Sequence, residues 1–88
     1  MAYEKITLEN LKLVGTPRWC KDNKWVEDNR FSCIEKVYLD RIKNTITLDD
    51  DTFEVADIDD YDKYIVVKFW VPENNGRSYH SALLNFVL

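Results

Sequence analysis

The carboxylates of this chain are concentrated in one segment that contains no base. Residues 49–62 read DDDTFEVADIDDYD and carry eight acidic side chains without a Lys or Arg. This acidic segment has a charge of −8, although the whole chain, with 16 acidic and 12 basic residues, has a net charge of only −4. Such a field attracts cations and basic surfaces and repels nucleic acid.

Three kinds of chemistry suit this segment: a solvated surface that only raises solubility, a surface that recognises a protein, or a metal site. We predict recognition, because carboxylates on the expected loops 49–51 and 57–62 would pair with Lys and Arg of a partner. Spaced along an edge, they would also resemble a phosphate backbone. The predicted partner-binding acids are Asp49, Asp50, Asp51, Asp57, Asp59, Asp60 and Asp62.

The metal alternative fits the sequence poorly. A calcium loop of the EF-hand type counted from Asp57 fails, because its sixth position is Asp62 instead of Gly and its twelfth is Lys68 instead of Glu. Zinc normally needs four ligands, and the chain has only two Cys and one His. We therefore predict neither a metal nor a cofactor.

A second candidate site interleaves cations with aromatic side chains between residues 18 and 31. This composition is typical of single-stranded nucleic-acid surfaces and also of protein hot spots. The acids in the same stretch bring it near neutrality, which disfavours direct nucleic-acid binding. We predict that Arg18, Trp19 and Trp25 contact the partner, and we expect one Trp, Trp25, to fold back over the core.

The sequence has few of the residues that catalytic sites usually contain. His80 is the only imidazole and lies in a predicted strand, where a structural, hydrogen-bonded or surface role is expected. A nucleophile would have to come from Cys20, Cys33 or Ser81. The only two glycines, at positions 15 and 76, form no phosphate-binding loop. We predict that the protein is not an enzyme.

The elements that would position these residues follow from a mainly period-two apolar pattern. Two β-rich runs, 45–48 and 52–55, flank the acidic loop 49–51 as a hairpin, with an Asp in the left-handed position that Gly usually takes. Residues 64–71 are apolar on both faces, so they form a central strand that Pro72 ends. Asn75 and Gly76 make the strongest turn signal.

Other segments are less definite. Gly15-Thr16-Pro17 should start a long loop at 15–32, with a helical turn or a short strand at 24–27 inside it. Residues 33–43 and 78–88 fit either helix or strand, and neighbouring turn signals favour strands. A bulge or kink is expected near Asn10.

At 88 residues the chain predicts one domain, 1–88. We predict a mainly β fold: a five- to six-stranded antiparallel meander, curled or closed into a partly open barrel. The predicted core residues are Ile6, Leu8, Leu13, Val37, Leu39, Ile46, Leu48, Phe53, Val55, Ile65, Val67, Phe69, Leu83 and Phe86.

The N-terminal residues contain four charges and no long apolar run, so we expect neither a signal peptide nor a membrane anchor, and a cytoplasmic protein with free thiols. The predicted function is a non-catalytic protein-binding module, an inhibitor that docks its acidic surface on a basic, nucleic-acid-binding partner protein. The alternative is a small barrel that binds a ligand or an oligonucleotide through the loop of Trp19 and Trp25. The sequence leaves the oligomeric state open.

Overall fold

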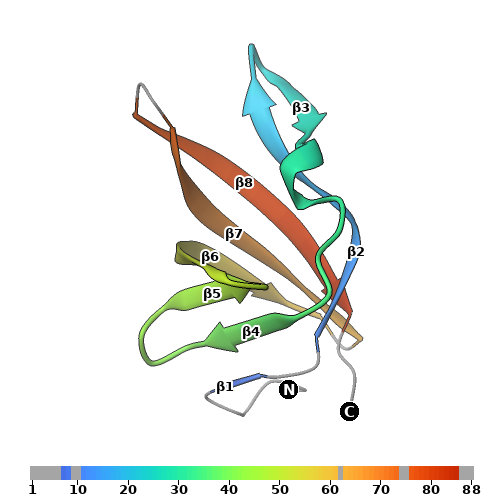
Figure 1. The fold of residues 1–88 in the computed structure, drawn as a ribbon, viewed down its shortest axis with the longest axis vertical. Coiled ribbons are helices and arrows are strands. Elements are labelled where there is room, and N and C mark those ends of the chain that lie inside the picture. The colour runs from blue at the N-terminus through green and yellow to red at the C-terminus, as the bar shows by residue number, and fades with distance from the viewer. Residues whose placement is uncertain (1–6, 9–10, 62, 74–75, 86–88) are drawn as a thin grey trace.

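The computed structural model describes residues 7–8, 11–61, 63–73 and 76–85. Within these ranges the chain forms eight strands and a single 3-10 turn, labelled in Figure 1. The strands are β1 (Thr7–Leu8), β2 (Lys12–Lys21), β3 (Lys24–Glu27), β4 (Val37–Asp40), β5 (Thr45–Leu48), β6 (Asp51–Asp60), β7 (Tyr64–Glu73) and β8 (Gly76–Asn85). The turn, η1, spans Asn29–Phe31. The predicted β class is confirmed.

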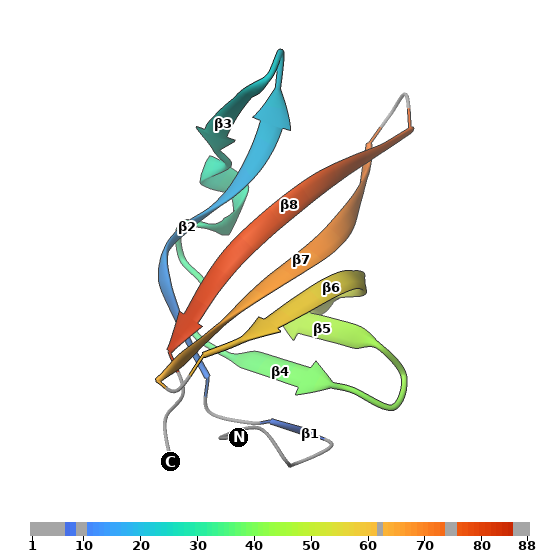
Figure 2. The ribbon, with the colours of Figure 1, turned by 180° about the vertical axis from the view of Figure 1, so that it is seen from behind.

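The strands form one sheet with the order β1-β4-β5-β6-β7-β8-β2-β3. From β4 to β8 the neighbours follow the chain as an antiparallel meander, and β2 then pairs antiparallel with β8. The sheet twists and curls without closing, with β1 and β3 at its two edges (Figures 1 and 2). The curled, open sheet was predicted, whereas the number of strands in the described ranges exceeds the expected five or six.

Residues 15–32 are not the long loop that the sequence predicts. β2 continues through Gly15, because the register with β8 shifts between Val14 and Arg18. This irregularity takes up Gly15, whose φ is 77°, a left-handed value that glycine adopts without a side-chain clash. A bulge thus replaces the predicted chain break.

The second half of that segment is a hairpin. Lys21 of β2 lies opposite Lys24 of β3, so Asp22 and Asn23 form a two-residue turn. Their φ angles are 52° and 64°, as hairpins of the primed turn types require, and Asp and Asn tolerate them. Of the two alternatives predicted at 24–27, the short strand is observed as β3, and the helical turn η1 lies after it at Asn29–Phe31.

Three other boundaries differ from expectation. β7 does not end at Pro72 but continues to Glu73. The pairing of β7 with β6 ends at Trp70, so the N–H that Pro72 lacks is not needed for a hydrogen bond to β6. The expected loop at residues 57–62 is wrong, because β6 runs to Asp60. The segments 33–43 and 78–88 contain β4 and β8, which confirms the choice of strand. Asn10 and Asn75 lie outside the described residues.

The core lies on the concave side of the curled sheet. Eight predicted core residues are buried there: Val37, Leu39, Ile46, Leu48, Val55, Ile65, Val67 and Phe69. Leu13 and Phe53 pack against them and are partly buried. The prediction that Leu83 belongs to the core is wrong. Ala82 and Leu84 of β8 point into the core, so Leu83 points outward and is 38% exposed. The side chains of Ile6, Leu8 and Phe86 lie outside the described part of the chain.

Phe31 brings η1 onto this core. Its ring meets Phe53 and Phe69 edge-on at centroid distances of 5.7 and 6.0 Å. Such edge-to-face pairs add to the stabilisation from burial. Through Phe31, the chain between β3 and β4 is packed over the concave face.

A buried carboxylate also joins η1 to the sheet. Asp28 is 7% exposed, and its Oδ2 lies 2.7 Å from Nε2 of His80, which is fully buried on β8. Asp28 also accepts hydrogen bonds from the backbone and the guanidinium of Arg30, which bridges onward to Glu73 of β7 at 2.7 Å. These bonds from Arg30 to the ionised carboxylate lower the pKa of Asp28 from 3.8 to about 2.

The carboxylate of Asp28 should make the stability of the fold depend on pH in the acidic range. Because its pKa is lower in the folded chain than in the unfolded one, the stabilisation is complete above pH ~4. As the pH falls toward 2 this stabilisation should be lost, and the free energy of unfolding should decrease by about 2 kcal/mol. Urea unfolding between pH 5 and pH 2 measures this loss, and Asp28→Asn should flatten it and destabilise the protein at neutral pH by ~2 kcal/mol. Asp57→Asn, on an exposed position, is the control. An equal acid dependence in the Asp28 variant would show that other carboxylates are responsible.

Candidate functional site

The first three acids of the acidic segment lie at the end of a hairpin. Asp49 and Asp50 form the turn between β5 and β6, and Asp51 begins β6 opposite Leu48. Asp49 has a φ of 55°, so it takes the left-handed position as predicted. We call residues 49–51 the acidic tip. Asp62, at the far end of the segment, lies outside the described residues.

The other predicted acids lie along β6, where cations of neighbouring elements approach them. Asp57 lies opposite Lys68 of β7, and Nζ of Lys68 is 3.8 Å from Oδ2 of Asp59. Asp60 has a guanidinium nitrogen of Arg41 at 3.7 Å, although its Oδ1 is buried without a hydrogen bond in the described part of the chain. The structure therefore separates these acids from the tip and gives them cations.

Two further observations show that basic side chains of the same chain partly neutralise the acids of β6. Arg77 of β8 reaches Glu54, with nitrogen and oxygen 3.3 Å apart. Tyr79, and after it the carboxylate of Asp59, raise the pKa of Lys68, so this ammonium keeps its charge at neutral pH. Exposed pairs of this kind stabilise the fold little, but they reduce the field that a partner meets.

Within the acidic tip the three carboxylates have different roles. Oδ1 of Asp49 accepts hydrogen bonds from the backbone N–H groups of Glu35 and Lys36 at 3.1 and 2.9 Å, so Asp49 holds the turn against the segment before β4. Asp50 and Asp51 are exposed and make no ion pair with any other described residue. Asp57 is also exposed and outside these ion pairs, but it lies opposite Lys68. Among the described acids of the segment, Asp50 and Asp51 are therefore the exposed carboxylates that face no cation across the ladder.

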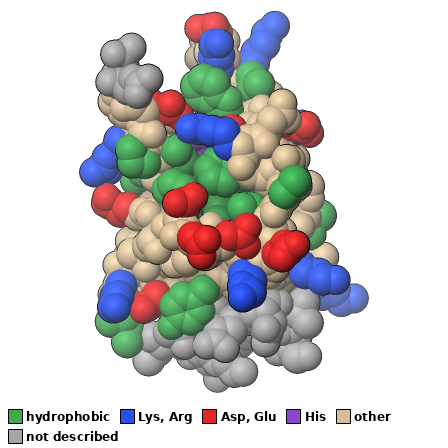
Figure 3. Space-filling model, in the orientation of Figure 1, with side chains coloured by type: hydrophobic (Ala, Val, Ile, Leu, Met, Phe, Trp, Pro, Cys, Tyr) green, Lys and Arg blue, Asp and Glu red, His purple; other side chains and the backbone are tan. Residues whose placement is uncertain are grey.

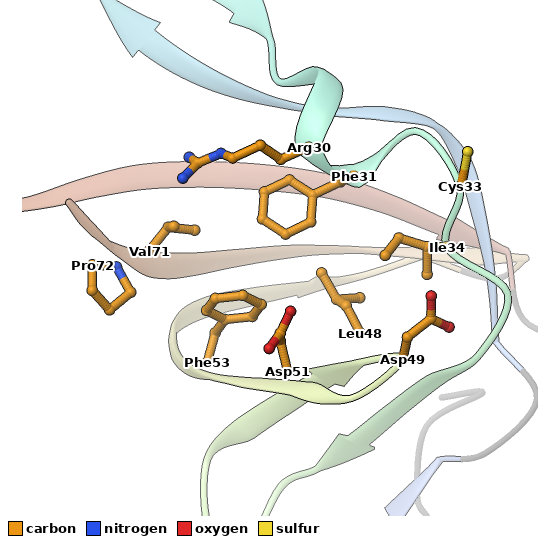
Figure 4. Close-up of a pocket in the computed structure, with 10 residues that line it drawn as sticks. All are labelled: Arg30, Phe31, Cys33, Ile34, Leu48, Asp49, Asp51, Phe53, Val71 and Pro72. Atoms are coloured by element: carbon orange, nitrogen blue, oxygen red, sulfur yellow. The ribbon is translucent and has the colours of Figure 1, made fainter.

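A hollow of about 500 Å³ lies between the acidic tip and η1 (Figure 4). Asp51 and Phe53 form its side on β6, Phe31 faces them from η1, and Arg30 stands at its other end. Asp51 shares the concave face with Leu48, because residues directly opposite in a ladder point to the same side. The residues lining the hollow are Arg30, Phe31, Cys33, Ile34, Leu48, Asp49, Asp51, Phe53, Val71 and Pro72.

The surface around the hollow is divided by charge. Figure 3 shows acidic side chains gathered below an apolar patch in the middle of this face, with a basic side chain above it. The basic side is already engaged, since Arg30 bonds to both Asp28 and Glu73. An incoming group thus meets apolar surface next to Asp51, which has no ion pair with a described residue.

The two predicted Trp residues do not form one surface. Trp19 lies opposite Val26, and Trp25 lies opposite Cys20, so the Trp side chains point to opposite faces of the β2–β3 hairpin. The expectation that Trp25 covers the core is wrong, because Trp25 is 49% exposed. Trp19 packs inward instead and stacks on His80 at a centroid distance of 6.0 Å. The convex face presents Arg18 beside Glu27.

Trp25 belongs to a different group, which we call the aromatic row. Its ring lies 6.3 Å from that of Tyr79, and Tyr79 meets Trp70 at 5.2 Å. The guanidinium of Arg77 covers Trp70 at 5.9 Å. The row crosses β3, β8 and β7 on the convex face. Sequence reasoning missed Tyr79 and Trp70, since only the register brings them beside Trp25.

In the described part of the chain, the two Cys and the His do not form one site. His80 is buried and engaged with Asp28, and the exposed thiols of Cys20 and Cys33 are unpaired. No group of three or more Cys, His, Asp or Glu suited to a metal occurs in the described ranges. Nor, over the same ranges, does any helix have the length and apolarity to cross a membrane.

Comparisons with known proteins identify no relative of this chain. No protein-family model matches it, and no curated protein or solved structure matches it either. A fold alone does not determine function, so the features that indicate one here are the acidic tip, the hollow and the aromatic row.

Within the acidic tip, the carboxylate of Asp49 has a structural role and that of Asp50 does not. Substitutions can test this difference. Asp49→Ala should destabilise the protein by about 1–2 kcal/mol, because two backbone N–H groups lose their acceptor and Ala disfavours the left-handed turn. Asp50→Ala should change the unfolding free energy by less than ~0.5 kcal/mol. Chemical denaturation of both variants measures the difference. Equal costs would contradict the structural role of Asp49.

Proposed function

We propose that the protein is a non-catalytic binding module that docks on another protein through its acidic tip. Its partner has a basic surface. Where that surface normally holds nucleic acid, the docked module acts as an inhibitor, because its carboxylates occupy the Arg and Lys that would grip phosphate.

The observation that carries this proposal is the uneven compensation of the acidic segment. Cations of the same chain approach Glu54, Asp59 and Asp60. At the tip, Asp50 and Asp51 are exposed and have no ion pair among the described residues. A chain that needed acid only for solubility gains nothing from collecting its uncompensated charge beside an apolar hollow. A docking surface gains orientation and a faster encounter from it.

Paired substitutions at the tip and along β6 test this proposal. The tip variant carries Asp50→Asn and Asp51→Asn, and the control carries Asp57→Asn and Asp59→Asn, so both lose the same charge. Partners are captured from the native host's lysate on the immobilised parent, identified by mass and purified for stopped-flow binding. The tip variant should bind about tenfold more weakly at low salt, mainly through a slower on-rate, and the control less than about threefold.

Salt and nucleic acid supply the second measurement. The difference between parent and tip variant should shrink as salt rises, because exposed charges are then screened. Duplex DNA should compete with the module for a nucleic-acid-binding partner. If the tip variant and the parent bind alike at every salt concentration, docking does not depend on the acidic tip.

The second candidate function is binding of single-stranded nucleic acid on the aromatic row. Three neighbouring rings capped by Arg77 are the observation that favours it, since bases stack on aromatic side chains and cations hold phosphates. A thymidine oligonucleotide should then quench Trp fluorescence, and Trp25→Ala should weaken binding about tenfold or more. Trp19→Phe, on the opposite face, is the matched control. Absence of quenching in the parent would exclude this candidate.

A further inference from the structure

We propose that the hollow between η1 and the acidic tip binds an extended segment of the partner in which a Lys or Arg lies two residues from an apolar side chain. This inference rests on the proposed function, since it names what the docked partner inserts. It assigns two subsites: an apolar one for the anchoring side chain and an acidic one at Asp50 and Asp51.

The apolar subsite is built from rings and branched side chains of three elements. Phe31 of η1, Phe53 of β6 and Val71 of β7 line it, together with Ile34 and Pro72. Phe31 is itself fixed by ring contacts with Phe53 and Phe69, so this side of the hollow is formed before a ligand arrives. A volume of about 500 Å³ lies in the range of ligand pockets and exceeds the space that one aliphatic side chain fills. Burial of such a side chain is the usual anchor at the centre of a protein interface.

The acidic subsite follows from the register of the β5–β6 hairpin. Asp51 lies opposite Leu48 and therefore on the concave face, beside Phe53 along the strand. Figure 4 shows its carboxylate directed to the hollow between Leu48 and Phe53. A carboxylate that lies on an apolar face and has no ion pair with a described residue complements a positive group on the ligand, and Asp50 next to it has the same sign.

These two subsites select a peptide segment over a compact ligand. The acidic tip lies at the rim of the hollow, so the ligand must continue past the apolar subsite to place its cation there. Arg30, at the other end, is already bonded to Asp28 and Glu73 and gives no reason for an acidic ligand. In an extended chain, side chains two residues apart point to the same side, so the anchor enters the hollow while the cation two residues further along reaches the tip.

Cys33 offers a direct test, because it lines the hollow and its thiol is exposed. Cys20, also exposed, lies on the convex face opposite Trp25 and serves as the matched control. The experiment uses Cys20→Ser, which leaves Cys33 alone, and Cys33→Ser, which leaves Cys20 alone. Each is equilibrated, in a thiol buffer, with peptides of sequence Gly-Leu-Lys-Lys, Gly-Ser-Lys-Lys or Gly-Leu-Glu-Glu that carry a disulfide to cysteamine. The protein thiolate attacks this disulfide, the peptide is joined to the protein, and cysteamine leaves as the thiol. The fraction of mixed disulfide is read by intact mass.

At Cys33 the Leu-Lys peptide should be captured about tenfold more than the Ser peptide, because burial of the Leu side chain adds to the tether. It should exceed the Glu peptide about threefold or more at low salt, and Asp51→Asn should reduce this charge preference while it leaves the Leu preference in place. At Cys20 the three peptides should be captured alike. Circular dichroism of each variant checks that the fold is kept.

Two results would overturn the inference. Equal capture of all peptides at Cys33 means that the hollow takes no anchor. A Leu preference without a charge preference means that it takes an apolar ligand of another kind. The proposed function still holds after either result if the tip variant binds its native partner more weakly than the parent does. If the tip variant instead binds like the parent while Cys33 keeps its peptide preferences, docking through the acidic tip is refuted and the peptide site in the hollow is not.

Discussion

The bond between Asp28 and His80 is the constraint on which the concave side of this molecule depends. Asp28 precedes η1, whereas His80 lies in the middle of β8, so one buried carboxylate fastens the crossing between β3 and β4 to the central sheet. Arg30 extends the connection to Glu73 of β7. Without this network, Phe31 would lose the support that keeps it over Phe53 and Phe69, and the hollow would lose one of its walls. A buried charge is retained here through hydrogen bonds on several sides, the condition under which such burial is tolerated.

The acidic segment obtains its character from strand pairing more than from its composition. Its residues alternate between faces of β6, so neighbouring strands determine which carboxylates meet a cation. Lys68 and Arg77 lie on the convex face of β7 and β8 and reduce the charge there. At the turn before β6, Asp50 and Asp51 have no ion pair with a described residue, so a chain with a modest net charge carries a concentrated negative end. The same alternation leads the tip to the apolar hollow, since Asp51 and Phe53 are two residues apart on one face.

The sequence was informative where the pattern was local. Period-two alternation predicted β5, β7, the first part of β6 and eight of the core residues. Turn signals favoured strands at β4 and β8 and a left-handed Asp in the β5–β6 loop. These features depend on neighbours along the chain or on burial alone. The loop predicted at 15–32 failed because Gly-Thr-Pro was interpreted as a break, although a bulge can absorb it. The signal that could have corrected it is Asp22-Asn23, a two-residue pair suited to a primed turn. The hollow, the aromatic row and the Asp28 network were not predictable, since each joins residues that only the register and the crossing of η1 bring together.

The position of β2 in the sheet has a consequence for how the chain is made. β2 pairs with β8, which lies more than sixty residues later, and its other neighbour is the short β3. During synthesis the meander from β4 to β7 can form from successive hairpins, whereas β2 has only the β3 hairpin until residues 76–85 leave the ribosome. Closing so long a loop costs entropy before any contact rewards it, so the pairing of β2 with β8 belongs to the late, slow part of folding. Until then the strand carrying Leu13 and Trp19 is an uncovered edge, a state in which other chains can pair with it.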